Sequence, residues 1–316
     1  MSQTRPRIGV IGTGAIGGFY GAMLARAGHD VHFLLRSEYE AVMAHGLRVE
    51  SAVHGSLALQ SVQACRDVAE MPACDWLLVC AKTTSNAELA PLIARAAAPA
   101  ARVVLLQNGL GVEDALRPLL PEGLHLLGGL CFICVHRAEP GVVVHEALGS
   151  INFAYHSGPG DEARAAVEEA VGLFGSAGIE ASGMPSLDQA RWQKLVWNAP
   201  FNGLAVLLDS GTEGLLGHPE SRALVKAVMD ETLGAAAACG HALPADLPEK
   251  MLFGTSRLPN YLPSMYHDFT HGRPLELEAL YTTPLAAAAR AGYAMPKTAM
   301  LLQALRFLED RRRSGR

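Results

Sequence analysis

The chain has 316 residues, of which half are hydrophobic and 18% are charged, and its formal net charge is −5. This balance is typical of a globular protein and excludes an intrinsically disordered chain, which needs less apolar content and more net charge. The negative net charge gives no electrostatic reason to expect a nucleic-acid partner. The length suits two domains better than a single core.

The first residues predict alternating strands and helices. Arg7 to Ile11 is a short β-branched run typical of a buried strand, and a glycine-rich turn follows it at once. Phe19 to Gly28 reads as a helix, and Asp30 to Leu35 reads as a second strand. A strand, a glycine turn, a helix and a strand within about thirty residues make up the βαβ unit of a parallel sheet.

The same alternation continues along the chain. We predict further helices at 38–44, 86–97 and 161–175, and further strands at 47–51, 56–60, 75–80, 102–107, 124–134 and 179–181. We also predict a hairpin of 141–147 with 150–155 that turns at Leu148 and Gly149.

The predicted secondary structure changes from Leu187 onward, where nearly every segment reads as helix. We expect loops at 211–219, 240–248 and 254–263, and a frayed basic tail at the final RRRSGR. The predicted fold is an α/β N-terminal domain with a mainly parallel sheet, residues 1–184, followed by an all-α C-terminal domain, residues 185–316.

The glycine turn predicts a dinucleotide site of the Rossmann type. In the pattern G-x-G-x-x-G, Gly12 allows a tight turn, Gly14 lets a pyrophosphate approach the backbone, and Gly17 lets the helix pack close to the strand. The helix N-terminus then offers N–H donors and a positive dipole end to the phosphates. The alternative is a glycine-rich turn that binds no ligand. The predicted cofactor-binding residues of the turn are Gly12, Thr13, Gly14, Ala15, Ile16 and Gly17.

Residues at the ends of three strands extend this prediction. Arg36, after the second strand, favours NADP(H) because a guanidinium can pair with a 2′-phosphate, whereas Glu38 argues for NAD(H). Lys82 and Asn108 end later strands, on the edge of the sheet where ligands bind. Each of these residues also has an alternative role that involves no ligand. In that case Arg36 is a solvated surface arginine, Lys82 a charged residue that precedes a helix, and Asn108 a turn-forming residue before glycine.

Lys194, Asn198 and Asn202 lie four residues apart inside an apolar segment. On a helix this spacing places them on one stripe, which is either solvated or lines a polar cleft. In a cleft beside Trp197 and Phe201 the lysine would be partly desolvated, which lowers its pKa and makes it a better proton donor. An exposed helix lysine and, for Asn202, a helix cap are the alternatives.

Together these motifs resemble the ketopantoate reductases (2-dehydropantoate 2-reductases) over nearly the whole chain. The resemblance rests on GTGAIG near the start, Arg36, Lys82, QNGLG at 107–111, KLVWNAPFN at 194–202 and SMYHDFTHGRPLELE at 264–278. It implies hydride transfer from NADPH to the ketone of ketopantoate, which gives pantoate for pantothenate and coenzyme A synthesis. Residues 273–275 depart from the family, which has a threonine-containing run there.

The resemblance also implies the roles of individual residues. It implies that Lys194 is the general acid and that Glu276, the second catalytic residue, accepts a hydrogen bond from a substrate hydroxyl. It implies cofactor contacts from Arg36, Lys82 and Asn108. It implies a substrate site formed by Asn108, Lys194, Asn198, Asn202, Ser264 and Glu276.

Other functions and partners stay open on the sequence. An NADP-dependent reductase of a different 2-oxo acid is one alternative, and a non-catalytic NADPH-binding sensor is another. We expect a small 2-oxo acid as partner, and a homodimer is compatible with the apolar run from Leu233 to Cys239.

Cysteine usage and hydropathy bear on location and on metals. Six cysteines without an export signal indicate reduced thiols in the cytoplasm. Arg95 and Arg102 interrupt the most hydrophobic stretch, so we expect no membrane span. Cys131 and Cys134, with His136 nearby, raise a metal site as an alternative. One C-x-x-C pair is weak support for it, and on a strand Cys131 faces away from the other two, so we expect no metal.

Overall fold

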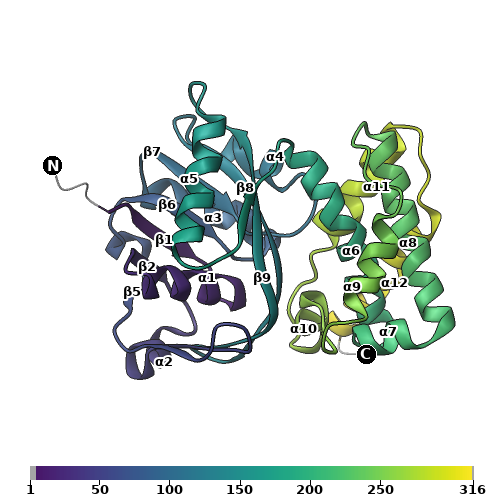
Figure 1. Cartoon of the computed structure of the whole chain (residues 1–316), viewed down its shortest axis with the longest axis horizontal. Coiled ribbons are helices and arrows are strands. Elements are labelled where there is room, and N and C mark those ends of the chain that lie inside the picture. The colour runs from purple at the N-terminus through teal and green to yellow at the C-terminus, as the bar shows by residue number, and fades with distance from the viewer. Residues whose placement is uncertain (1–4, 315–316) are drawn as a thin grey trace. The chain divides into compact units, whose positions relative to one another are not determined.

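The chain, of which this computed structural model describes residues 5–314, divides into two compact units (Figure 1). The first, Met1–Gln107 with Val112–Leu187, is an α/β unit built on one sheet. The second, Asn108–Gly111 with Asp188–Arg316, is helical. The predicted fold class is therefore confirmed.

The ten strands of the α/β unit form one sheet. They are Arg7–Ile11 (β1), Asp30–Leu34 (β2), Leu47–Ser51 (β3), Leu57–Leu59 (β4), Gln63–Cys65 (β5), Cys74–Val79 (β6), Ala97–Leu105 (β7), His125–Glu139 (β8), Val142–Ser157 (β9) and Ala181–Gly183 (β10). Their order is β4-β3-β9-β8-β7-β6-β1-β2-β5, with β10 on β9. All neighbours between β8 and β5 pair in parallel, so their carboxyl ends share one edge of the sheet.

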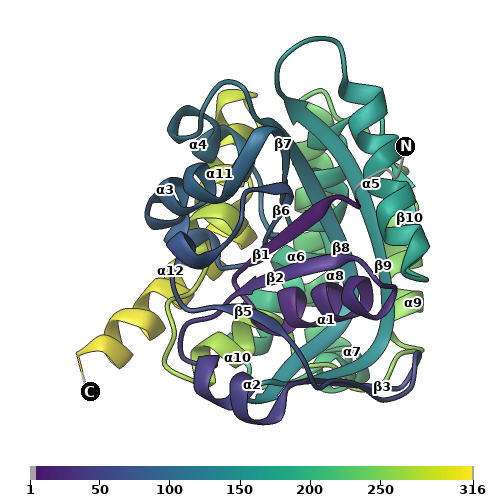
Figure 2. The same ribbon diagram turned by 90° about the vertical axis from the view of Figure 1, so that its left-hand side faces the viewer.

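Helices cover this sheet, and the sheet curls around one of them. The helices of the unit are Ala15–Arg26 (α1), Tyr39–His45 (α2), Asn86–Ala96 (α3), Val112–Leu116 (α4) and Ala163–Ser176 (α5), with short turns at Val68–Glu70 (η1), Thr83–Ser85 (η2) and Arg117–Leu119 (η3). Helix α1 packs against β1 and β2 and also against β3, β8 and β9, which are distant in the strand order (Figure 2). This requires a curled sheet. Phe19, Tyr20 and Met23 of α1 are fully buried in the resulting core.

The antiparallel pair of β8 and β9 corrects the predicted hairpin. The turn lies at Pro140 and Gly141, and β9 continues through Leu148 and Gly149. Both residues have positive φ, +65° and +123°, and the register shifts there between the pairs that join β8 to β9. Leu148 and Gly149 therefore form a bulge inside a strand instead of a turn.

Two shorter segments of the α/β unit also differ from the predictions. The last strand is Ala181–Gly183 instead of 179–181, because Ile179 is buried in the core before the chain reaches β9. Strand β5, three residues beside β2, was not predicted.

The second unit is a set of packed helices. They are Leu187–Leu207 (α6), Thr212–Gly217 (α7), Pro219–Ala238 (α8), Leu247–Thr255 (α9), Ser264–Thr270 (α10), Thr283–Arg290 (α11) and Pro296–Arg313 (α12), with a π-helix at Glu278–Thr282 (η4). Their core includes Trp192, Phe201 and Met229, all nearly inaccessible to solvent. Within residues 5–314, no helix is both long and apolar enough to cross a membrane.

Two predictions on the helical unit are wrong. Helix α7 lies within the predicted loop at 211–219. Helix α12 extends to Arg313, so the run of arginines is helical instead of a frayed tail; residues 315–316 lie outside the described residues.

The N-terminus of α12 is fixed by a buried carboxylate on α8. Glu231 accepts hydrogen bonds from the backbone N–H groups of Lys297 and Thr298, each at 2.9 Å, and from the Thr298 hydroxyl at 2.9 Å. These are N–H groups that a helix leaves without an internal partner, and a carboxylate also offsets the positive end of the helix dipole. Helix α12 is therefore held firmly at its start.

Candidate active site

The glycine turn between β1 and α1 is shaped by packing at two glycines and left open at the third. Gly12 has a φ of +94°, and a Cβ there would lie 2.4 Å from the Ala81 backbone nitrogen. A Cβ on Gly17 would lie 2.4 Å from the Gly12 carbonyl oxygen. A Cβ on Gly14 would meet nothing within 4 Å. The protein's own packing thus requires Gly12 and Gly17, while the space beside Gly14 is what the close approach of a diphosphate needs.

The first turn of α1 has free donors for such a group. No described side chain caps this helix, and its first turn, from Ala15 and Ile16, contains no acidic residue. The initial N–H groups of a helix lack internal partners and attract anions. Thr13 is buried, and its hydroxyl donates to the Leu34 carbonyl oxygen at 3.3 Å, which ties the turn to the end of β2.

An exposed arginine and a buried glutamate follow β2. Arg36 is exposed, and its guanidinium makes no ion pair with any residue of the described chain. Glu38 is only 6% exposed, and its carboxylate pairs with Arg137 of β8. The acidic residue that argued for NAD(H) is therefore neutralised by a partner within the α/β unit, whereas Arg36 presents its charge to solvent.

Two buried amides join the loops after β6 and β7. Gln107 donates to the Ala81 carbonyl oxygen at 2.7 Å and exchanges two hydrogen bonds with the Asn86 side chain, at 2.7 and 3.2 Å. Lys82 is half-buried and lies in the loop between Ala81 and Asn86, at the start of η2. Sequence reasoning missed Gln107 and Asn86 as residues that shape the loop carrying Lys82; the available signal was a polar residue directly after an apolar strand.

The loop Asn108–Gly111 groups with the helical unit, although it follows β7 in the chain. The Leu110 N–H donates to the Ala279 carbonyl oxygen at 2.9 Å. Gly109 has a φ of +106°, and a Cβ there would lie 2.4 Å from the Ala279 Cβ. Close contact of the loop with η4 therefore requires glycine at this position. Asn108, half-buried, is held on the same unit as Lys194 and Glu276.

Helix α6 buries the polar stripe that the sequence predicted. Lys194 is 9% exposed, and Asn198 and Asn202 are less exposed still. Beside them Trp197 stacks on Phe201 with 4.6 Å between ring centroids. This burial excludes a solvated stripe for these three residues.

Asn202 connects α6 to the start of α10. Its Nδ2 donates to the Asn198 carbonyl oxygen at 3.0 Å, and its Oδ1 accepts from the Met265 N–H at 3.1 Å. The Ser264 hydroxyl donates to the same Oδ1 at 3.5 Å. Asn202 therefore caps a neighbouring helix instead of ending its own, which continues to Leu207. These contacts bring Asn198, Asn202 and Ser264 together.

Glu276 lies two residues before η4 and is 3% exposed. Its backbone carbonyl accepts a hydrogen bond from the Leu280 N–H at 3.2 Å. Glu278, two residues on, is exposed. The predicted substrate residues thus all lie on the helical unit, whereas the glycine turn, Arg36 and Lys82 lie on the α/β unit.

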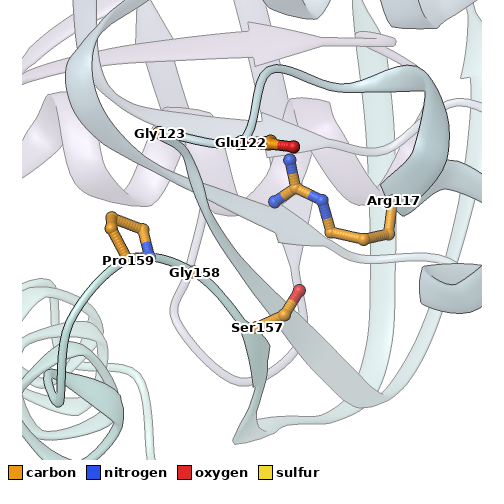
Figure 3. Close-up of a pocket in the computed structure, with 6 residues that line it drawn as sticks. All are labelled: Arg117, Glu122, Gly123, Ser157, Gly158 and Pro159. Atoms are coloured by element: carbon orange, nitrogen blue, oxygen red, sulfur yellow. The ribbon is translucent and has the colours of Figure 1, made fainter.

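A pocket of about 490 Å³ on the α/β unit lies elsewhere (Figure 3). It is lined by Arg117, Glu122, Gly123, Ser157, Gly158 and Pro159. These residues lie before the start of β8 and at the end of β9, which is antiparallel to it, and this is the opposite sheet edge from the glycine turn. The Arg117 guanidinium is occupied by the backbone carbonyls of Leu120, Pro121 and Leu124. This pocket is therefore not the dinucleotide site.

Potential metal ligands do not converge. Cys131 is buried in the core of the α/β unit, and Cys134 lies three residues further along the same strand. Burial raises the pKa of the Cys134 thiol to about 12. Among the described residues, no group of three His, Cys, Asp or Glu side chains is placed to hold a metal ion.

A parallel sheet, an open glycine turn at its edge and a helical second unit are typical of a nicotinamide-dependent dehydrogenase or reductase. The family model "Ketopantoate reductase PanE/ApbA" matches residues 8–158, and its C-terminal counterpart matches residues 186–309. The chain belongs to the ketopantoate reductase family, whose members are oxidoreductases, and both the resemblance and the enzyme class are confirmed.

Individual relatives match over almost their whole length. A 2-dehydropantoate 2-reductase from Nostoc sp. is 40% identical over 310 residues, which cover 97% of this chain and 96% of that protein. The crystal structure of 2-dehydropantoate 2-reductase from Geobacter metallireducens has a TM-score of 0.89 at 40% identity and covers 95% of this chain and 99% of its own. The Methylococcus capsulatus structure of the same name has a TM-score of 0.81 at 37% identity, covering 96% and 97%.

Two alanine substitutions in the glycine turn should separate folding from binding. We expect Gly14→Ala to keep the melting temperature within about 2 °C of wild type and to raise the Kd for the nicotinamide cofactor about tenfold or more, because its methyl group enters the open space. Gly12→Ala should lower the melting temperature by about 5 °C or more, because of its clash and its positive φ. Differential scanning fluorimetry and calorimetric titration measure both effects. Wild-type cofactor affinity in Gly14→Ala would contradict this reading.

Proposed function

We propose that the protein catalyses the NADPH-dependent reduction of ketopantoate (2-dehydropantoate) to pantoate, in the route to pantothenate and coenzyme A. The reaction is that of the relatives which share 40% identity along almost the whole chain. The observation that carries the assignment to this chain is the burial of Lys194 and Glu276 in one helical unit. Lysine and glutamate side chains are seldom buried, and buried ionisable side chains are concentrated at functional sites.

We assign the cofactor to the α/β unit. The uncapped start of α1 and the open space at Gly14 suit a pyrophosphate, and Arg36 supplies the charge that a 2′-phosphate needs. The pairing of Glu38 with Arg137 supports NADPH over NADH. Lys82 and Asn108 complete the proposed cofactor contacts, with the other residues of the turn from Gly12 to Gly17. The bound nicotinamide supplies the hydride.

We assign proton transfer to Lys194. Reduction of a ketone develops negative charge on its oxygen, and an ammonium can stabilise that charge and donate the proton. The effect is stronger away from bulk water. Glu276 accepts a hydrogen bond from the substrate hydroxyl. Asn108, Asn198 and Ser264 orient the substrate, and Asn202 contributes through the hydrogen bonds by which it holds Ser264 and the start of α10.

A reductase of a different 2-oxo acid is the second candidate, favoured by one observation. Arg273, in the segment that departs from the family, pairs through Nε with Asp268 at 2.8 Å. The Asp268 carboxylate neutralises this arginine, so the pair changes the shape of the segment three residues before Glu276 without adding net charge, which suits a 2-oxo acid of different size. A non-catalytic NADPH sensor is the remaining alternative.

The surroundings of the enzyme follow from the same proposal. The partner is a small 2-oxo acid, and neither nucleic acid nor a membrane is involved. All six cysteines are free thiols, which suits a reducing cytoplasm. We also propose a homodimer. Met300 and Phe307, seven residues apart on α12, are exposed on one face of that helix, and exposed apolar side chains of this kind suit a subunit contact.

Removal of Lys194 tests the reaction directly. We expect Lys194→Ala to lower kcat/KM for ketopantoate by about 10²- to 10⁴-fold, because no group donates the proton, and to leave the Kd for NADPH within about twofold. The matched control is Lys250→Ala, which removes an exposed lysine of the same unit that pairs with Asp246. Oxidation of NADPH by ketopantoate at the wild-type rate in Lys194→Ala would refute the assignment.

The pair of Glu38 and Arg137 predicts a change of cofactor preference. We expect Arg137→Ala to lower the ratio of the NADH Kd to the NADPH Kd about tenfold, because the unpaired carboxylate repels a 2′-phosphate and can accept from a ribose hydroxyl. The double variant with Glu38→Gln should regain the wild-type ratio, since the carboxylate is gone. Calorimetric titration with both cofactors measures the ratio. A double variant that behaves like Arg137→Ala would show that the pair has no part in selection.

A further inference from the structure

The last turns of α12 hold the main chain that leads into Glu276. Glu309 accepts a hydrogen bond from the Leu275 N–H through Oε1 at 2.8 Å. Arg312 donates through Nη2 to the Arg273 carbonyl oxygen at 2.7 Å. Between these two points lies Pro274, which has a fixed φ and no N–H of its own. The backbone is therefore bound on both sides of Pro274, directly before Glu276.

Arg312 also binds the end of the preceding helix. Its Nη1 donates to the Phe269 carbonyl oxygen at 2.6 Å, and its guanidinium carbon lies 5.1 Å from the centre of the Phe269 ring. The Phe269 carbonyl oxygen also accepts from the Gly272 N–H at 3.2 Å, so Arg312 adds a second donor at the end of α10. The planar fork of a guanidinium can satisfy two carbonyls at once, which a single ammonium group does less well.

Burial distinguishes these two residues from their neighbours. Glu309 is buried and Arg312 is half-buried, whereas Arg311 and Arg313 are exposed. Arg313 contacts Glu309 at 3.3 Å from the solvent side. Glu309 and Arg312 are three residues apart and share a helix face. Because Glu231 fixes the other end of α12, this helix is a rigid support for residues 273–275.

We propose that Glu309 and Arg312 are positioning residues of the active site, which fix residues 273–275 so that the Glu276 carboxylate meets the substrate hydroxyl. The inference rests on the proposed role of Glu276 in binding substrate. Neither residue is proposed to contact substrate; each acts through the main chain. A displacement of about 1 Å at a reacting or binding group can cost about 100-fold in rate, so this support matters for catalysis.

The test compares Glu309→Ala, Glu309→Gln and Arg312→Ala with wild type. We expect Glu309→Ala and Arg312→Ala to raise the KM for ketopantoate about tenfold or more, with a smaller change in kcat. Glu309→Gln should restore the wild-type KM, because the amide oxygen accepts the same hydrogen bond from Leu275. A purely structural loss would lower the active fraction, and hence kcat, at an unchanged KM. Arg311→Ala, on the same turn, is the matched control and should match wild type.

Two further readouts keep the outcomes distinct. Hydrogen exchange of a peptide covering residues 269–276 should be faster in Glu309→Ala and normal in Glu309→Gln, and the Kd for NADPH should stay within about twofold in all variants. Glu276→Gln is measured alongside. If it raises KM while Glu309→Ala and Arg312→Ala do not, the positioning role is refuted and the proposed function stands. If Glu276→Gln has the wild-type KM, the proposed role of Glu276 fails, and the positioning role fails with it.

Discussion

The π-helical turn after Glu276 is the constraint on which the arrangement of the helical unit depends. Its wider hydrogen-bonding pattern directs the Thr283 N–H to Glu278, so Ala279 loses the donor that an α-helix would give it. The next candidate donor is residue 284, which is a proline and has no N–H. The Ala279 carbonyl is therefore available to the Leu110 N–H, and this bond attaches the loop of Asn108 to the helical unit. The π-helical turn thus binds a loop from a distant part of the sequence.

Helix α12 supports the same segment from the other side of Glu276. The π-helix fixes the chain after this residue, and Glu309 with Arg312 fixes the chain before it. Helix α6 supplies Lys194 and, through Asn202, holds Ser264 at the start of α10. Side chains that belong to three distant stretches of sequence are in this way carried on one unit of packed helices, which is the rigidity that a preorganised site requires.

Local patterns predicted the parts of the fold that depend on local physics. The turn from Gly12 to Gly17 and the stripe of Lys194 follow from strand and helix periods, and the structure has both elements. Leu148 and Gly149 were misread because a positive φ suits a turn and a bulge equally, and only pairing with β8 decides between them. The arginines of α12 were misread because the carbonyls that Arg312 binds lie about forty residues earlier in the chain. The contact of the Asn108 loop with Ala279 likewise could not be predicted from the residues near either of them in the sequence.

The role of Glu38 in the site likewise could not be predicted from neighbouring residues. In the sequence an acid two residues after Arg36 argues against NADP(H), but its ion-pair partner, Arg137, is 99 residues away.

The measurement that tests the whole account most directly is the rate of NADPH oxidation with a panel of branched and straight 2-oxo acids, with and without a 4-hydroxyl group. The account predicts the highest kcat/KM for ketopantoate, which has both the branch and the hydroxyl. Turnover only of acids without the hydroxyl, or tight NADPH binding with no turnover of any acid, would contradict it.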